Sequence, residues 1–307
     1  MPNEITIPAV DGYPLAVTSF PPAVVGTGDA KPPIALINGA TGVKRGYYRA
    51  FARHLAGSGM HTLTWDYRGI GDSRPDGPLS AMTATMADWG RLDLTGMLQW
   101  IYATYPDHTV VTVGHSVGGQ LLGLTDEVAR VRAACCVGAQ CGYYRLWPWP
   151  RRWLLGLFWH LFLPAAVKVA GRYPSRLLGM GEDLPPQVAR QWAAWCRNRH
   201  FMVDFAGVPL AQTFDLFGGS LLALSFSDDT YAPEKSVATL VEFFTSATHR
   251  RHRHLRPADV EARKIGHFGF FRERFRNTLW RKARRWLWAQ VLNRPLSDGP
   301  RHEPVTI

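Results

Sequence analysis

The stretch that decides the fold runs Thr109-Val-Val-Thr-Val-Gly-His-Ser-Val-Gly118. It opens with an apolar run typical of a buried strand, and helical spacing begins near its end and continues over residues 117–129. Between the two stands Gly-His-Ser-Val-Gly, which matches the pattern G-x-S-x-G at a turn from a strand to a helix. We therefore predict that Ser116 is a nucleophile at the tip of a tight, strained turn.

Such a turn needs small residues on both sides, and Gly114 and Gly118 stand two positions before and two after the serine. Ser116 then lies at the N-terminal end of the helix, where the helix dipole favours a developing negative charge. His115 is adjacent in sequence, but its side chain is expected to point away from the serine, so we assign it a structural role.

Further strands and helices are predicted on both sides of this turn. Buried runs typical of strands occupy residues 34–37, 60–65, 133–139 and 220–226, two short strands lie within residues 4–20, a last strand is expected at 253–256, and helical spacing covers residues 47–56, 86–105, 233–244 and 270–292. This alternation is typical of a mainly parallel sheet with helices on both faces, an α/β fold.

A serine needs a base, and a base needs a carboxylate that orients it. His267 stands in the Gly-flanked stretch Ile-Gly-His-Phe-Gly, after the last predicted strand. Asp228 and Asp229 both follow the strand at 220–226, at the edge where sites gather in parallel sheets. The order serine, aspartate, histidine is the one expected for this fold. Asp66 and Asp72 precede the serine, and we assign them to a structural turn.

The regular alternation stops over residues 143–219, which are rich in Trp and Pro and contain helical pieces. We predict a helical cap there, inserted between two parts of one core at residues 1–142 and 220–294, and a disordered tail at 295–307. The apolar run from Trp153 to Leu163 is shorter than the ~20 residues that a membrane span needs. A lid over the site is the favoured interpretation, and a segment at a membrane surface is the alternative.

The formal net charge is +11, and the basic excess is local. Between residues 250 and 294, 14 Lys or Arg face three acidic residues, a balance of +11 that leaves the rest of the chain neutral. No nucleic-acid-binding motif accompanies the charge, so no nucleic acid partner is expected. The four cysteines form no C-x-x-C pair, and no signal peptide is recognised. We therefore expect free core thiols, no metal site and a cytoplasmic location.

The chain resembles the α/β-hydrolase superfamily over nearly its whole core. The resemblance rests on Asn38-Gly39-Ala40, the run Asp66-Tyr-Arg-Gly-Ile-Gly-Asp-Ser73, the serine turn, and the aspartate and histidine loops. It is nearest to uncharacterised bacterial hydrolases close to the serine aminopeptidase-like branch. It implies an eight-stranded sheet, favours Asp229 over Asp228 because Asp229-Thr-Tyr-Ala-Pro233 fits the family pattern, and places the oxyanion hole at the backbone N–H groups of Ala40 and Val117.

These residues predict a serine hydrolase that cleaves a small or medium apolar carboxylic ester through an acyl-enzyme, without a cofactor. Ser116, His267 and Asp229 would form its catalytic triad, with Asp228 as the second choice of acid. The same triad would also serve an aminopeptidase, amidase, thioesterase, acyltransferase or cofactor-free haloperoxidase. A catalytically silent protein that binds a membrane surface is the alternative outside catalysis. The natural substrate and the oligomeric state stay open.

Overall fold

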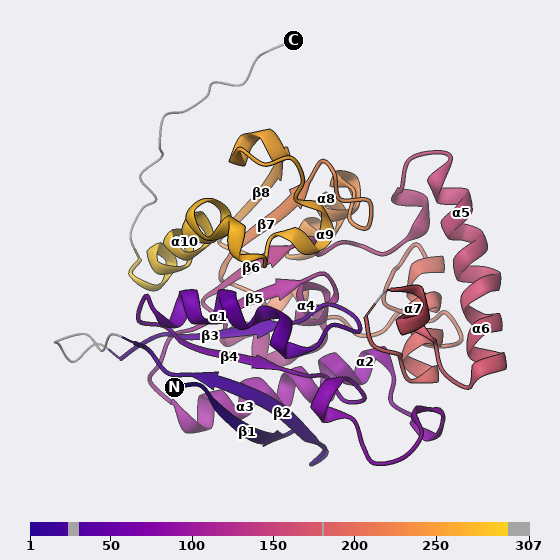
Figure 1. The fold of residues 1–307 in the computed structure, drawn as a ribbon, viewed down its shortest axis with the longest axis horizontal. Helices are drawn as coiled ribbons and strands as arrows, with labels where there is room; N and C mark the ends of the chain where they lie inside the picture. Colours follow the sequence, from indigo (N-terminus) through magenta and orange to yellow (C-terminus); the bar gives the residue numbers. More distant parts are fainter. Residues whose placement is uncertain (24–30, 180, 294–307) are drawn as a thin grey trace, which may run out of the picture.

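A computed structural model describes residues 1–23, 31–179 and 181–293, and its centre is an eight-stranded sheet (Figure 1). The strand order is β1-β2-β4-β3-β5-β6-β7-β8. The bounds are β1 (Asn3–Pro8), β2 (Pro14–Phe20), β3 (Ile34–Asn38), β4 (His61–Trp65), β5 (Val110–His115), β6 (Ala133–Val137), β7 (Ser220–Phe226) and β8 (His249–Leu255). β2 pairs antiparallel with β1 and with β4, and all the other neighbours are parallel. The predicted α/β fold is confirmed.

The five strands from β3 to β7 are buried along their whole length because helices cover both faces of the sheet. On one face, α1 (Arg49–Ala56) and α10 (Arg281–Val291) enclose a core rich in aromatic rings. The other face carries α2 (Met86–Asp88), α3 (Thr95–Thr104), α4 (Val117–Gln120) and α8 (Glu234–Phe243). Near-continuous apolar strands are what a sheet covered on both faces requires.

The chain leaves the sheet after β6 and returns to it at β7. In between, a helix runs without a break from α5 (Arg151–Leu157) through a π-helical turn (Phe158–Phe162) to α6 (Leu163–Ala170), and α7 (Pro186–Arg197) follows. Figure 1 shows α5, α6 and α7 together beside one end of the sheet. Among the described residues of this insertion, the only β pairings are isolated bridges at Tyr173–Leu184 and Val203–Pro209.

Several predicted elements differ in extent from the structure, and three differ most. The helix predicted over residues 270–292 is α-helical only from Arg281, after a 3₁₀ turn (Glu273–Phe275) and a π-helical turn (Arg276–Trp280). The helix expected over residues 117–129 is α-helical only to Gln120, and two 3₁₀ turns replace the rest. Glycine weakens this helix, and Gly123 must stay bare because a Cβ there would come within 2.2 Å of the Phe214 ring. The last strand starts at His249, earlier than predicted, because its Arg and His side chains hide the pattern of a strand. The tail predicted at 295–307 lies outside the described residues.

Candidate active site

Ser116 stands alone between the end of β5 and the start of α4, with its backbone in a conformation that side chains rarely adopt. Its φ is 53° and its ψ is −118°, and its N–H donates to the carbonyl of Val137 at 3.0 Å. Backbone strain of this kind persists only where the surroundings enforce it, and it is common at functional sites. The hydroxyl is thereby held above the C-terminal edge of the parallel strands.

The two glycines of the motif are there because no side chain fits. A Cβ on Gly114 would lie 2.6 Å from the Cα of Gly119, and a Cβ on Gly118 would lie 2.2 Å from the carbonyl oxygen of Asn38. Real Cβ atoms do not approach backbone this closely. The close packing of α4 against β5 and β3 therefore depends on both positions.

His267 and Asp229 come together at the same edge of the sheet, although 38 residues separate them. Nδ1 of the histidine lies 2.8 Å from Oδ2 of the aspartate, and both side chains are almost fully buried. The other oxygen of Asp229 accepts the backbone N–H groups of Tyr231 at 2.8 Å and Ala232 at 3.0 Å. The carboxylate is thus held in place. Nε2, the other nitrogen of the ring, has no hydrogen-bond partner among the described residues, so no hydrogen bond joins it to the Ser116 hydroxyl in this structure.

Asp228 has a different task from its neighbour. Its two oxygens accept the backbone N–H groups of Ile265 at 2.8 Å and Gly266 at 3.0 Å, directly before the histidine. The ring of His267 is contacted by Asp229 and not by Asp228. The second-choice acid therefore shapes the histidine loop and does not orient the imidazole.

The predicted oxyanion donor Ala40 is already engaged. Its N–H donates to the hydroxyl of Tyr48 at 2.8 Å, and the tyrosine is fully enclosed in the core. The N–H that the sequence assigns to the oxyanion hole is therefore already bonded in this structure, and its role as an oxyanion donor stays a prediction. The physical reason is that the turn after β3 folds back onto the buried Tyr48, a contact that no local sequence signal reveals. Among the described residues, the N–H groups of Thr41 and Val117 have no hydrogen-bond partner.

A chain of hydrogen bonds joins this turn to the other two loops. The Tyr48 hydroxyl lies 2.9 Å from Nδ1 of His115, and Nε2 of His115 lies 3.0 Å from the carbonyl oxygen of His267. A carbonyl only accepts, so Nε2 of His115 carries the proton and Nδ1 accepts the Tyr48 O–H. Complete burial holds the pKa of His115 well below its usual value, which keeps the ring neutral in this role. His115 is thus structural, as the sequence suggested.

The family can now be named from comparison with known proteins. Residues 29–203 match the model of a family described as serine aminopeptidase, S33. The chain belongs to this family. It is an α/β hydrolase, as the resemblance implied. No curated protein matches the chain.

Solved structures with the same fold include several esterases. One from Pyrococcus furiosus shares 13% identity, with a TM-score of 0.58 and coverage of 94% of this chain and 91% of that one. One from Exiguobacterium antarcticum shares 17% identity, with a TM-score of 0.56 and coverage of 94% and 100%. A serine hydrolase without a lid from Xanthomonas campestris shares 16% identity, with a TM-score of 0.52 and coverage of 97% of each chain. At these identities the likeness shows the fold alone.

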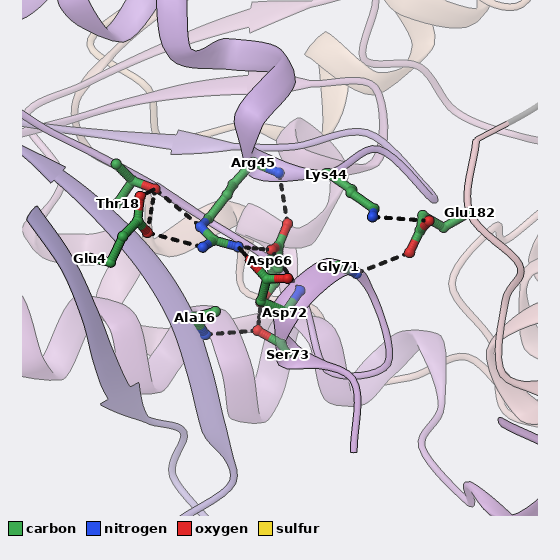
Figure 2. Close-up of polar contacts among 10 residues, drawn as sticks. All are labelled: Glu4, Ala16, Thr18, Lys44, Arg45, Asp66, Gly71, Asp72, Ser73 and Glu182. Carbon is green, nitrogen blue, oxygen red and sulfur yellow. Dashed lines mark hydrogen bonds and ion pairs between the residues drawn. The ribbon is translucent and has the colours of Figure 1, made fainter. Parts of the chain in front are cut away.

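In this S33-family hydrolase the other two candidate carboxylates serve the fold. The side chain of Asp66 is buried, and it accepts the backbone N–H groups of Arg45 at 2.6 Å and Asp72 at 3.1 Å. The Arg45 guanidinium pairs with Asp66, Asp72 and Glu4, and Figure 2 shows it at the centre of this network. These groups fasten the turn after β4 to the edge of the sheet at β1 and β2, and no bond from Asp66 or Asp72 to His267 is found among the described residues.

The insertion is bound to the turn after β3. The sequence did not predict this contact. Figure 2 shows the buried Glu182 reaching both Lys44 and the N–H of Gly71. Its own N–H donates to the carbonyl of Gly42 at 2.7 Å, and Arg176 pairs with its carboxylate. Glu182 thus clamps the insertion onto the turn that contains Ala40 and Thr41.

One further position in the site was missed. Gly138 follows β6 with a φ of 58°, and a Cβ on it would lie 3.1 Å from Nδ1 of His267 and 3.3 Å from Oδ2 of Asp229. Because glycine has no side chain, Gly138 leaves room for the pair of His267 and Asp229. The available signal was a glycine near the C-terminal end of the strand predicted at residues 133–139. Among the described residues, no group of three or more His, Cys, Asp or Glu is arranged to hold a metal ion.

Proposed function

We propose that the protein is a serine hydrolase that cleaves an apolar carboxylic ester by way of an acyl-enzyme. The observation that carries the proposal is the buried pair of His267 and Asp229, 2.8 Å apart, at the same edge of the sheet as the strained Ser116. The three residues come from three separate loops and have the chemical types that nucleophilic catalysis needs.

In the proposed reaction, Ser116 Oγ attacks the ester carbonyl while its proton passes to Nε2 of His267. Asp229 accepts the Nδ1–H of the imidazolium and stabilises its charge. The tetrahedral intermediate collapses, the bond to the alkoxy group breaks, and His267 returns the proton to the departing oxygen. Water then repeats the sequence on the acyl-enzyme and releases the acid.

The negative oxygen of the intermediate needs N–H donors that are not already in use. We assign this role to Val117, at the first turn of α4, and to Thr41, which replaces Ala40 in the proposal because the Ala40 N–H is held by Tyr48. The Val117 N–H directly follows Ser116 in the chain, and the Thr41 N–H lies in the turn that Glu182 contacts. Loss of one such donor typically costs about 3 kcal/mol in the activation free energy.

An apolar substrate is supported by the side chains around the histidine. The rings of Tyr231 and Phe268 lie 5.2 Å and 5.1 Å from the His267 ring between centroids, and both rings are partly open to solvent. The insertion reaches this region too, because Nε1 of Trp147 donates to the carbonyl of Thr230 at 3.0 Å. We propose that the insertion acts as a lid and that these aromatic groups contact the acyl or alkyl part of the ester.

An active-site-directed probe tests the nucleophile. We expect a fluorophosphonate to label the wild-type protein and to leave Ser116→Ala unlabelled. Ser80→Ala is the matched control, because it removes an exposed serine outside the motif, and it should be labelled as the wild type is. A series of p-nitrophenyl esters of rising chain length would then locate the preferred acyl group. Equal labelling of wild type and Ser116→Ala would refute the assignment.

The family description raises aminopeptidase activity as the second candidate. An aminopeptidase has to bind a free ammonium group, usually with a carboxylate. The insertion carries no Asp or Glu between residues 143 and 181, and Glu182 and Asp183 pair with Arg176 and Arg172. Asp204 accepts two backbone N–H groups of its own loop, which leaves Asp215 as the remaining carboxylate of the insertion. Aminoacyl p-nitroanilides should therefore be poor substrates beside esters, and faster turnover of the anilides would reverse this preference.

A further inference from the structure

The helix that runs from Arg151 to Ala170 is unusually apolar for its position. It is 20 residues long, and it is the one described helix with the length and composition to cross a membrane. Only 17% of its most apolar stretch is buried inside the protein, however. Figure 1 shows α5 and α6 at the outer margin of the molecule, on the far side of α7 from the sheet.

This helix has two apolar faces, and only one of them is covered. Trp159, Leu163 and Val167 recur every four residues and are buried in the core of the insertion. A second apolar set faces solvent and consists of Trp153, Leu154, Leu157, Leu161, Phe162 and Val169, each exposed by 54% or more. We call this set the outer face. A surface helix of a soluble protein normally places polar residues there, so the outer face lacks a partner.

The buried residues of this helix indicate whether it could cross a membrane or lie on its surface. A helix that spans a bilayer would have to withdraw Trp159, Leu163 and Val167 from their contacts with the rest of the protein. A helix that lies in the plane of the interface keeps these contacts and buries only its outer face. The second arrangement requires no change in the fold.

The charges around the helix point to the chemistry of the partner. Residues 143–181 contain six Lys or Arg and no Asp or Glu. Among the described residues, four of the six form no ion pair with a carboxylate: Arg145, Arg151, Arg152 and Lys168. The three arginines lie at the N-terminal end of the outer face, and Lys168 lies near its C-terminal end. The exposed Trp149 and Trp153 are close in sequence to the arginines. Trp with Arg or Lys beside an aliphatic stripe is the composition that favours an anionic lipid interface.

A second copy of the chain is a poorer partner for the same surface. Two outer faces packed against each other would bring the unpaired cations of one copy close to those of the other, without carboxylates between them. We therefore propose that the outer face of the 151–170 helix binds the surface of a bilayer that contains anionic lipid. This binding does not require catalysis, although it would bring an esterase site to apolar substrates held in a membrane.

Vesicle flotation of the whole protein tests the proposal directly. We expect binding to vesicles of phosphatidylcholine mixed with phosphatidylglycerol, weaker binding to phosphatidylcholine alone, and release at high salt. Leu157→Gln combined with Leu161→Gln should weaken binding on the order of tenfold or more, because two apolar side chains leave the interface. The matched control is Val10→Gln combined with Leu216→Gln, which changes two exposed apolar residues elsewhere and should bind as the wild type does.

Further variants separate the parts of the proposal. Arg151→Gln with Lys168→Gln should lower binding to the anionic vesicles and reduce its dependence on salt. Ser116→Ala should bind as tightly as the wild type, so a failure of the proposed esterase activity would not affect this test. A far-UV circular dichroism spectrum and a urea unfolding midpoint equal to those of the wild type would show that the Leu157→Gln, Leu161→Gln variant is folded.

Three results would overturn the proposal. The first is no binding to either kind of vesicle, and the second is binding by the Leu157→Gln, Leu161→Gln variant that equals that of the wild type. The third is a wild-type dimer in sedimentation analysis that this variant converts to a monomer, since the outer face would then be covered by a second copy.

Discussion

At the scale of single residues, two adjacent carboxylates do different work. Asp229 contacts the imidazole of His267, while Asp228 accepts the two N–H groups that lead into that residue. We predict that Asp229→Asn lowers kcat on an ester by on the order of 10⁴-fold, because the amide no longer holds the correct tautomer or stabilises the imidazolium. The measurement is steady-state hydrolysis of a p-nitrophenyl ester.

Asp228→Asn is the matched control for that variant. It preserves the size of the side chain and one acceptor oxygen, so kcat should fall by only about tenfold and the free energy of unfolding by about 1–3 kcal/mol. Equal losses of kcat in the two variants would contradict the division of roles between the two carboxylates.

A second prediction concerns the hydroxyl of Tyr48. Tyr48→Phe would leave the Ala40 N–H and Nδ1 of His115 without partners in a buried place, so we expect a loss of about 1–3 kcal/mol in stability. The turn after β3 and the histidine loop would both loosen, and kcat should fall on the order of tenfold. Tyr47→Phe, on the more exposed neighbour, should have a smaller effect on both quantities. A rise in kcat for Tyr48→Phe would show instead that the freed Ala40 N–H is the oxyanion donor.

Residues of the candidate site differ in how far the sequence foretold them. The serine turn, the late aspartate loop and the Gly-flanked histidine each follow a strand, so their order along the chain predicts a common edge of the sheet. The choice between Asp228 and Asp229 came only from family resemblance, since both have the same local setting. The bond from Ala40 to Tyr48 could not be foreseen, because it depends on how one turn folds back over a helix.

At the scale of elements, the insertion and the turn after β3 are joined through Glu182. Glu182→Ala would remove the carboxylate that pairs with Lys44 and Arg176 and accepts the Gly71 N–H. The turn that holds Thr41 would lose its side-chain contact at Lys44, while the backbone bond from residue 182 to the carbonyl of Gly42 would remain. We predict a fall in kcat of about tenfold with a smaller change in KM, because the turn positions an oxyanion donor that acts mainly in the transition state.

Two further variants show whether this effect is specific. Glu182→Gln keeps an acceptor for the Gly71 N–H and should recover part of the loss. Asp183→Ala removes the neighbouring carboxylate, which pairs with Arg172 and does not reach the turn, so its kcat should stay near the wild-type value. A change confined to KM in Glu182→Ala would mean that the clamp shapes substrate binding and not the transition state.

Strands and helices were predicted well where the spacing of apolar residues was regular. They were predicted poorly where exposure at the sheet edge or close backbone packing determined the residue types instead. The buried strands at 34–37 and 220–226 were placed to within a residue or so because two covering layers demand continuous apolar side chains. β8 was largely missed because an edge strand tolerates a run of Arg and His. The helix after the serine was overestimated because close packing at Gly119 and Gly123 requires glycine, which weakens a helix.

At the scale of the whole molecule, buried neutral histidines make stability depend on pH. Burial lowers the pKa of His61 and holds that of His115 well below its usual value. Burial together with the nearby Arg284 and Arg276 lowers the pKa of His54 to about 4. Below about pH 6.5 the unfolded chain binds protons that the folded protein does not, so each group removes stability as the pH falls.

His54 allows the sharpest test of this effect. Its Nε2 is buried without a hydrogen-bond partner among the described residues, between the rings of Phe51 and Trp280. The wild type should lose on the order of 1 kcal/mol more unfolding free energy than His54→Gln when the pH falls from about 7 to about 5, because glutamine does not titrate. Urea unfolding at both pH values measures this difference. Asp93 changes the pH dependence in the opposite direction, because burial raises its pKa to about 7 and the folded protein therefore gains stability from it as the pH falls. Both proteins contain Asp93, so its contribution cancels in the comparison. Equal pH dependence in the two proteins would mean that His54 takes up its proton as readily in the folded state as in the unfolded one.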